Sequence, residues 1–195
     1  MITLRNRRRT GAGWQASWAT LLLCLVVMLG SGGFGSGGKG ALASDLTLLR
    51  NQLASNLAKV DRSNQVELIE DRGALVIRLS AGLLYESGQV QLRPQALPVL
   101  DVIGTTLAAT KQRMVVEGHS DSDPMLPNPT IPDNWALSGA RANGVLRYLR
   151  EFHGIDDARL ATAGYADTHP VASNETPAGK ARNRRVEIRV LAQGT

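Results

Sequence analysis

The chain has 195 residues and a mass of 20.9 kDa, enough for one ordinary domain with appended segments and too short for two full enzyme domains. Hydrophobic residues make up 43% and charged residues 20%, a balance that excludes a wholly disordered chain, a fibre or a multi-span transporter. Of the 22 basic residues, four lie within the first nine positions, so the rest of the chain is nearly neutral against its 17 acidic residues. No basic footprint for nucleic acid is therefore expected on the folded part.

The amino-terminal segments predict a membrane anchor. Residues 1–13 are basic, and residues 14–30 are mostly apolar and contain no charged side chain. As a helix, 14–30 would be roughly 25 Å long, close to the thickness of a bilayer core, with Trp14 and Trp18 suited to the interface. By the positive-inside rule, 1–13 is expected to be cytoplasmic, which predicts a single-pass inner-membrane protein whose remainder is periplasmic.

A cleaved signal peptide is the alternative interpretation of the same segment. Ala41-Leu42-Ala43 resembles a small-residue cleavage site, although it lies well beyond the end of the apolar run at Gly30. Cleavage there would leave a secreted periplasmic protein. The single cysteine, Cys24, lies within the apolar run and is interpreted as a small apolar residue.

A glycine-rich linker and a helix are expected next. Residues 31–43 are rich in glycine, a composition typical of a flexible tether. Ser44 is a candidate N-cap for a linker helix over 44–62, whose apolar positions form one stripe: Leu46, Leu49, Leu53, Leu57 and Val60. This stripe could pack on its own domain or pair with a second copy in a parallel homodimer.

From residue 66 onward, the pattern alternates between strand and helix. The chain order predicts strands at 66–70 and 74–80, a helix at 92–110, a strand at 114–116, a helix at 134–152, a strand at 160–165, a short helix at 176–183 and a strand at 185–191. We expect an α/β (α+β) sandwich of the βαβαβ type, with helices on one face of a mixed sheet.

Several motifs in this region identify a family resemblance. They are Glu117-Gly118-His119-Ser120-Asp121, Asn134-Trp135-Ala136-Leu137-Ser138-Gly139-Ala140-Arg141-Ala142, Gly164-Tyr165 and Asn183-Arg184-Arg185-Val186-Glu187. In this order, residues 66–191 resemble the OmpA-like peptidoglycan-binding domain. The proline-rich stretch 124–132, together with an amino-terminal span, resembles the MotB-like branch of flagellar stator proteins.

The resemblance implies a site for the diaminopimelate of peptidoglycan. That side chain ends in an ammonium and a carboxylate on one carbon, which require an anion and a cation held together. The resemblance assigns these roles to Asp121 and Arg141, and an acid with a planar guanidinium suits such a zwitterion. Asn134 and Ser138 share a predicted helix face with Arg141, which makes them further ligand candidates. Arg184 is either a ligand contact or a structural partner of an acid such as Asp121.

The expected function is non-enzymatic anchoring to the wall, with no cofactor. His119, His153 and His169 lack metal-ligand spacing, so no metal site is predicted, and no nucleophile motif of an enzyme occurs. A stator subunit working with a MotA-like channel partner is the alternative. Against it, Thr20 follows Trp18-Ala19 where the stator family carries a membrane aspartate, and threonine does not titrate near neutral pH.

Overall fold

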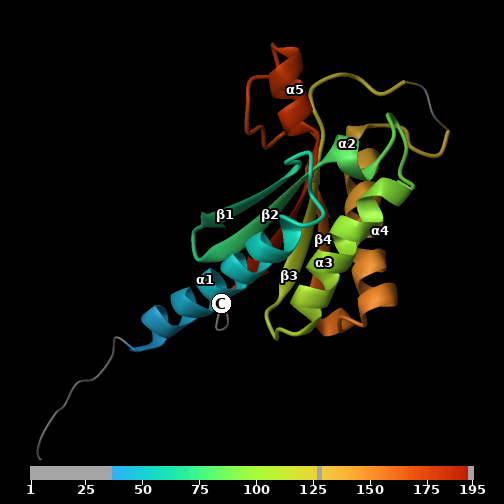
Figure 1. The fold of residues 1–195 in the computed structure, drawn as a ribbon. Helices are drawn as coiled ribbons and strands as arrows, with labels where there is room; N and C mark the ends of the chain where they lie inside the picture. The colour runs from blue at the N-terminus through green and yellow to red at the C-terminus, as the bar shows by residue number, and fades with distance from the viewer. Residues whose placement is uncertain (1–36, 127–128, 193–195) are drawn as a thin grey trace, which may run out of the picture. The chain divides into compact units, whose positions relative to one another are not determined.

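The computed structural model describes residues 37–126 and 129–192 (Figure 1). The predicted segments 1–13 and 14–30, and the first part of the 31–43 linker, lie outside these residues. Within the described part of the chain, no helix has both the length and the apolar character needed to cross a bilayer.

Helices and strands alternate along the described chain. They are α1 (Gly37–Leu57), β1 (Val66–Asp71), β2 (Ala74–Ser80), α2 (Ala81–Leu84), the 3-10 turn η1 (Pro94–Ala96), α3 (Leu97–Ala108), β3 (Met114–His119), α4 (Asn134–His153), the 3-10 turn η2 (Asp157–Arg159), β4 (Leu160–Gly164), α5 (Pro177–Asn183) and β5 (Arg185–Leu191). The expected mixed α/β fold is confirmed.

The five strands form one mixed sheet in the order β1-β2-β5-β3-β4. β1 and β2 form an antiparallel hairpin whose turn contains Arg72 and Gly73, both with positive φ, a conformation that glycine adopts without steric cost. β5 pairs antiparallel with both β2 and β3, whereas β3 and β4 are parallel. The last strand of the chain therefore occupies the centre of the sheet.

Alternating side chains give the sheet one apolar face and one charged face. Leu75, Ile77 and Leu79 of β2 and Val186, Ile188 and Val190 of β5 are fully buried in the main core. Helices α1, α3 and α4 cover this face (Figure 1). The intervening residues of the same strands, including Arg78 and Glu187, lie on the opposite face.

Helix α1 differs from the prediction at both ends. It begins at Gly37, within the predicted 31–43 linker and seven residues before the expected N-cap Ser44, and it ends at Leu57 rather than at residue 62. Once tertiary packing holds a helix, extending it by one residue costs little free energy. Ala41, Leu42 and Ala43 favour the helical state, and the segment is helical despite its glycines.

The leucine stripe of α1 packs on its own domain. Leu46, Leu49, Leu53 and Leu57 are buried in the core cluster, next to α3. The stripe is therefore not free to pair with a second copy, and the first of the two interpretations is correct. The predicted homodimer remains a prediction, and it would need another surface.

Candidate functional site

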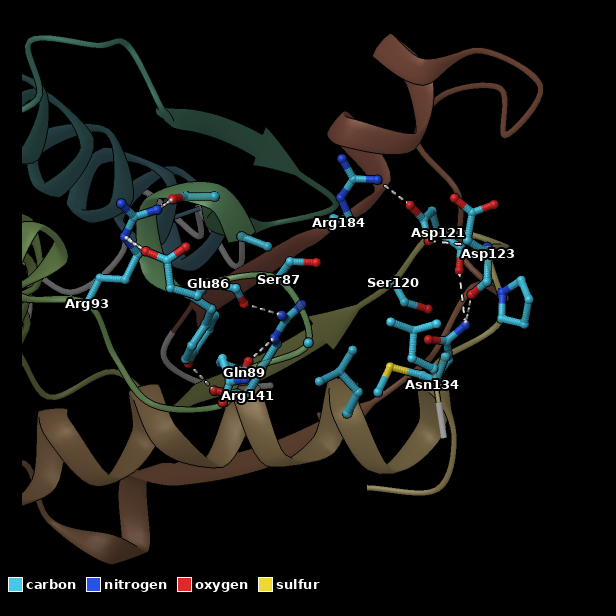
Figure 2. A pocket seen from close by; sticks show the side chains of 18 residues that line it. Glu86, Ser87, Gln89, Arg93, Ser120, Asp121, Asp123, Asn134, Arg141 and Arg184 are labelled. Carbon is cyan, nitrogen blue, oxygen red and sulfur yellow. Dashed lines mark hydrogen bonds and ion pairs between the residues drawn. The ribbon is translucent and has the colours of Figure 1, made fainter. Parts of the chain in front are cut away.

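A cavity of about 690 Å³ opens at the carboxyl end of β3 (Figure 2). Its walls come from α2 and the loop that follows it, from the loop after β3, from the first half of α4 and from Arg184, which lies between α5 and β5. Four of the five predicted site residues line this cavity: Asp121, Asn134, Arg141 and Arg184. The fold thus brings together residues that are up to 63 positions apart in the chain.

Asp121 is held firmly by the loop that carries it. The residue is 5% exposed, and the preceding Ser120 donates its N–H to the carbonyl of Ala166 at 2.8 Å. Its Oδ1 accepts the N–H of Asp123 at 3.2 Å, and its Oδ2 forms an ion pair with Nη1 of Arg184. The carboxylate therefore has a fixed position on the cavity wall.

Asn134 braces this same loop. Its side-chain Nδ2 donates to the carbonyls of Asp121 at 3.3 Å and Asp123 at 2.9 Å. Helix α4 begins at this residue because Asp133 caps it, accepting the N–H of Ala136 at 2.8 Å. The amide of Asn134 consequently ties the start of α4 to the loop that presents the acid.

Arg141 lies two helical turns further along α4 and is also 5% exposed. Its Nε donates to the carbonyl of Gln89 at 3.0 Å and its Nη2 to the carbonyl of Glu86 at 3.2 Å, while Nη1 has no hydrogen-bond partner among the described residues. The guanidinium lies over the ring of Tyr85, 5.1 Å from its centroid, and the Tyr85 hydroxyl donates to the backbone carbonyl of Arg141 at 2.6 Å.

The charge on Arg141 persists despite its burial. Burial lowers the pKa of this guanidinium, the ionisation of Tyr85 would raise it, and nearby Arg184 lowers it while Asp121 raises it. Because an arginine guanidinium keeps its proton far above neutral pH, the side chain remains a cation at neutral pH. Asp121, Arg141 and Arg184 therefore interact electrostatically within one cavity.

The charges that line the cavity balance, with three acids and three arginines, but they are not all paired with one another. Asp121 pairs with Arg184, Asp123 with Lys180 at 2.6 Å, and Glu86 with Arg93 at 3.2 Å. Arg141 bonds only to carbonyl oxygens, so its charge has no acidic counterpart among these pairs. A ligand that brings a carboxylate would supply the missing anion.

Ser138 is the predicted site residue that the structure does not place in the cavity. It is 1% exposed, donates its hydroxyl to the carbonyl of Trp135 at 3.1 Å and accepts the N–H of Ala166 at 3.1 Å. Here α4 and β3 approach each other closely, since a Cβ on Gly118 would lie 1.9 Å from the Ser138 carbonyl oxygen. Sharing a helix face with Arg141 was insufficient, because Ser138 faces the sheet at this contact.

Several residues of the cavity have no counterpart in the sequence prediction. The carbonyls of Glu86 and Gln89 fix the guanidinium of Arg141, and a bridge between Tyr85 and Leu92 closes the loop that presents them. No motif marks this loop, because its contribution is made by backbone atoms. Asp123 was also missed, although it follows the predicted acid by only two positions, and so was Lys180, which pairs with Asp123 from outside the cavity lining.

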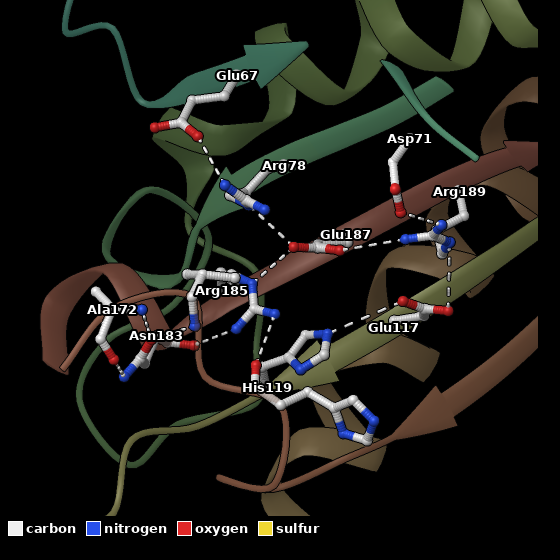
Figure 3. A network of polar contacts seen from close by, with 12 residues as sticks. Glu67, Asp71, Arg78, Glu117, His119, Ala172, Asn183, Arg185, Glu187 and Arg189 are labelled. Atoms are coloured by element: carbon white, nitrogen blue, oxygen red, sulfur yellow. Dashed lines mark hydrogen bonds and ion pairs between the residues drawn. The ribbon is translucent and has the colours of Figure 1, made fainter. Parts of the chain in front are cut away.

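A second polar cluster lies on the charged face of the sheet (Figure 3). Ligand atoms of Glu117, His119 and Glu187 lie within 4.8 Å of one another, a spacing that could hold a metal ion. However, Oε1 of Glu187 accepts from Arg185 at 2.7 Å and from Arg78 at 2.9 Å. Guanidinium groups thus already neutralise the central carboxylate, and we describe the cluster as a structural ion-pair network.

His119 belongs to this network as a packing residue. Its ring stacks on that of Tyr165, with centroids 5.4 Å apart, and burial, followed by the charge of Arg185, lowers its pKa to about 4. His119 is therefore neutral at physiological pH.

The sheet topology and the acid–guanidinium cavity at the end of β3 are those expected of an OmpA-like α/β domain. The OmpA family model matches residues 84–184, and the chain belongs to this family. Motility protein B and a putative MotB-like protein are among the proteins to which it is similar, which indicates a MotB-like branch.

Curated relatives include proteins of Bacillus subtilis and Pseudomonas aeruginosa. Motility protein B of Bacillus subtilis is 29% identical over 157 residues, which cover 80% of this chain and 60% of the relative. A peptidoglycan-associated lipoprotein of Pseudomonas aeruginosa is 31% identical over 172 residues, covering 88% of this chain and 95% of that protein. The uncharacterized protein YtxE of Bacillus subtilis is 35% identical, but the match spans only 51% of its length.

Solved structures agree with the fold. The cell wall anchor of the T6SS from Pseudomonas aeruginosa is 36% identical with a TM-score of 0.67, covering 74% of this chain and 99% of that one. A putative MotB-like protein from Desulfovibrio vulgaris is 26% identical with a TM-score of 0.73, covering 80% of this chain and 97% of that one. Motility protein B, the peptidoglycan-associated lipoprotein and the cell wall anchor are named for motility, peptidoglycan association and anchoring rather than for an enzymatic activity.

Proposed function

We propose that this protein is a single-pass protein of the inner membrane that binds the diaminopimelate of peptidoglycan. It does so without catalysing a reaction, and this binding anchors it to the cell wall. The observation that carries the proposal is that one cavity holds a fixed carboxylate, Asp121, and the guanidinium of Arg141, which has no acidic partner among the described residues. The similarity to a cell wall anchor and to a peptidoglycan-associated lipoprotein supports the same function.

The two groups would hold opposite ends of the zwitterion. The ammonium of the ligand would be accepted by the carboxylate of Asp121, and its carboxylate would accept from Nη1 of Arg141. Both are charge-assisted hydrogen bonds, about twice as strong as neutral ones. Because loop carbonyls hold the other two nitrogens of Arg141, the free nitrogen is already oriented when the ligand arrives.

The periplasmic location of the domain rests on the amino-terminal sequence. Basic residues 1–13 and the apolar segment 14–30 would place the domain outside the cytoplasm. Cleavage after Ala43 would instead release a stand-alone periplasmic protein with the same binding site.

A stator subunit is the second candidate, favoured by the 29% identity to Motility protein B over 80% of this chain. In that case a MotA-like channel protein would be the membrane partner and the working unit would be a homodimer. Proton transport through the span is not expected, because Thr20 does not titrate near neutral pH. Expression in a strain that lacks its stator B subunit tests this alternative, since restored swimming would establish it.

Sedimentation with purified diaminopimelate-type sacculi tests the wall-binding proposal. Full-length protein in detergent should co-sediment with the sacculi. Asp121→Asn, which keeps the size of the side chain and removes its charge, should weaken retention at least about tenfold. Asp157→Asn is the matched control, because Asp157 is exposed on η2, outside the cavity. Equal retention of Asp121→Asn and wild type would refute the proposed site.

Arg141 requires a milder change than truncation. Its side chain supports the loop of Glu86 and Gln89, so alanine would disturb the cavity wall as well as the charge. Arg141→Lys keeps the charge but cannot make the fork of hydrogen bonds, and should weaken retention while the variant remains folded by circular dichroism.

A further inference from the structure

Arg184 occupies the carboxylate to which the proposed function assigns the ligand ammonium. Nη1 of Arg184 pairs with Oδ2 of Asp121, and Figure 2 shows its guanidinium turned toward that acid across the cavity. We propose that Arg184 is an exchangeable cation that stands in for the ammonium of the ligand and so makes the site select a zwitterion over a simple amine. This inference rests on the proposed function and concerns the specificity of that same site.

The surroundings of Arg184 allow its side chain to move while its backbone remains fixed. Its side chain is 44% exposed, and Asp121 is its one hydrogen-bonding partner among the described residues. Its backbone N–H donates to the carbonyl of Lys180 at 3.0 Å, and its own carbonyl accepts the N–H of Ala81 at 3.0 Å. Leaving Asp121 thus requires only side-chain rotation at the cavity rim.

The neighbouring Arg185 shows what a fixed arginine looks like in the same chain. Its side chain is 4% exposed and donates to Glu187 at 2.7 Å, to the carbonyl of Asn183 at 3.2 Å and to the carbonyl of His169 at 3.0 Å. The two consecutive arginines therefore differ in mobility. Arg185 is fixed on the sheet face by three contacts, whereas the half-exposed side chain of Arg184 makes a single contact.

Asp121, in contrast, cannot follow Arg184. Its side chain is 8% exposed, and its loop is held by the contacts of Ser120, Asp123 and Asn134. An incoming ammonium would therefore replace Arg184 at an acceptor that stays in place.

The charge balance of this exchange distinguishes two classes of ligand. Asp121, Arg141 and Arg184 together carry one excess positive charge. A simple amine would displace Arg184 and raise the local charge to two, with both guanidiniums lacking an anion. A zwitterion adds no net charge, and its carboxylate is accessible to both Arg141 and the displaced Arg184. The displaced arginine is thus compensated only when the ligand brings a carboxylate.

Two peptides that differ by one carboxylate test this inference. We would use stem tripeptides ending in meso-diaminopimelate or in L-lysine, titrated calorimetrically into full-length protein in detergent. Wild type should prefer the diaminopimelate peptide by at least about tenfold. In Arg184→Gln this preference should fall at least about fivefold, chiefly because the lysine peptide binds more tightly once its competitor for Asp121 is gone.

Two further variants separate the exchange from general effects. Arg182→Gln removes the same charge from an exposed position of α5 outside the cavity and should leave the preference unchanged. Arg184→Lys keeps a cation that can leave Asp121 for the ligand carboxylate and should retain most of the preference. Circular dichroism of each variant reports whether the fold is intact.

The outcomes separate this inference from the proposed function. An unchanged preference in Arg184→Gln, with wild type still binding the diaminopimelate peptide and sacculi, would overturn the exchange and leave wall binding standing. Failure of wild type to bind both the peptide and sacculi would overturn the proposed function and the exchange together.

Discussion

The cavity at the end of β3 and the network on the charged face of the sheet both contain acids and arginines. They differ in how many of these charged groups already have a hydrogen-bonding partner of opposite charge. In the network, Glu187 accepts from Arg185 and Arg78, and Arg189 donates to Asp71 at 2.8 Å, so acids and guanidiniums bond mainly to one another. In the cavity, within the part of the chain that the structure describes, one nitrogen of Arg141 has no hydrogen-bond partner and the half-exposed side chain of Arg184 makes one contact. Buried arginine–carboxylate pairs alone do not identify a binding site; unused hydrogen-bonding capacity beside a cavity does.

The largest expected effect on stability comes from breaking the network. Glu187→Ala leaves the buried charge of Arg185 without its acid, and the free energy of unfolding should fall by about 3–5 kcal/mol. Urea denaturation measures it. The control Glu151→Ala removes an acid of the exposed pair with Arg147 and should cost at most about 1 kcal/mol. Similar losses in the two variants would contradict the contrast between closed network and solvated pair.

The next effect is a pH dependence carried by His119. Its pKa is lowered from 6.5 to about 4 in the folded state. Between these values the unfolded chain binds more protons, so the free energy of unfolding should decrease as pH falls from 6.5 to 4, by up to about 3 kcal/mol. Burial raises the pKa of Glu117, and this partly offsets the loss.

Urea denaturation at several pH values checks this prediction. His119→Gln should show a flatter dependence over the same range, because the titrating group is gone. A wild-type curve as flat as that of the variant would show that His119 does not carry the effect.

A third change acts on both regions through the backbone. Gly118→Ala would place a Cβ 1.9 Å from the carbonyl oxygen of Ser138, forcing α4 away from β3. We expect a loss of about 2–3 kcal/mol of stability, and weaker retention on sacculi because α4 carries Asn134 and Arg141. Thermal unfolding and sedimentation measure the two effects.

Gly139→Ala provides the matched control for that change. A Cβ at Gly139 meets no atom within 4 Å, and alanine favours a helix interior, so this variant should gain about 0.5–1 kcal/mol and bind the wall normally. Equal behaviour of the two alanine variants would contradict the close approach of helix and strand.

The smallest expected effect on stability is that of Asp121→Asn, the variant expected to impair wall binding. Arg184 is 44% exposed, so water solvates its charge once the acid is gone, and the free energy of unfolding should change by less than about 1 kcal/mol. Denaturation with guanidinium chloride measures this free energy of unfolding. A loss as large as that of Glu187→Ala would mean that Asp121 belongs to a structural network rather than to a binding site.

Local signals in the sequence predicted most elements of this fold. The strands predicted at 74–80 and 185–191 have the same bounds as β2 and β5 of the structure. The start of α4 at Asn134 was also predicted correctly, and the structure adds Asp133 as its cap. These features depend on neighbouring residues, so a sequence pattern can reveal them.

Features that depend on distant contacts were predicted less well. The sequence left open whether Arg184 contacts the ligand or pairs with an acid such as Asp121. Local patterns could not decide this, because Arg184 and Asp121 are 63 positions apart. The carbonyls that hold Arg141 come from a loop 52 and 55 positions away, and no side-chain motif marks them. Ser138 was placed with the ligand contacts because helix periodicity cannot tell which part of a face meets the sheet.

The burial of the α1 leucines has a practical consequence for cutting the chain into fragments. The family match ends at residues 84 and 184, inside the folded unit, and omits β1, β2 and the central strand β5. A recombinant piece with those limits would leave the remaining strands and α3 with apolar surface facing water and would be prone to aggregation. Fragments meant to report on wall binding should therefore extend from before Leu46 to beyond Leu191.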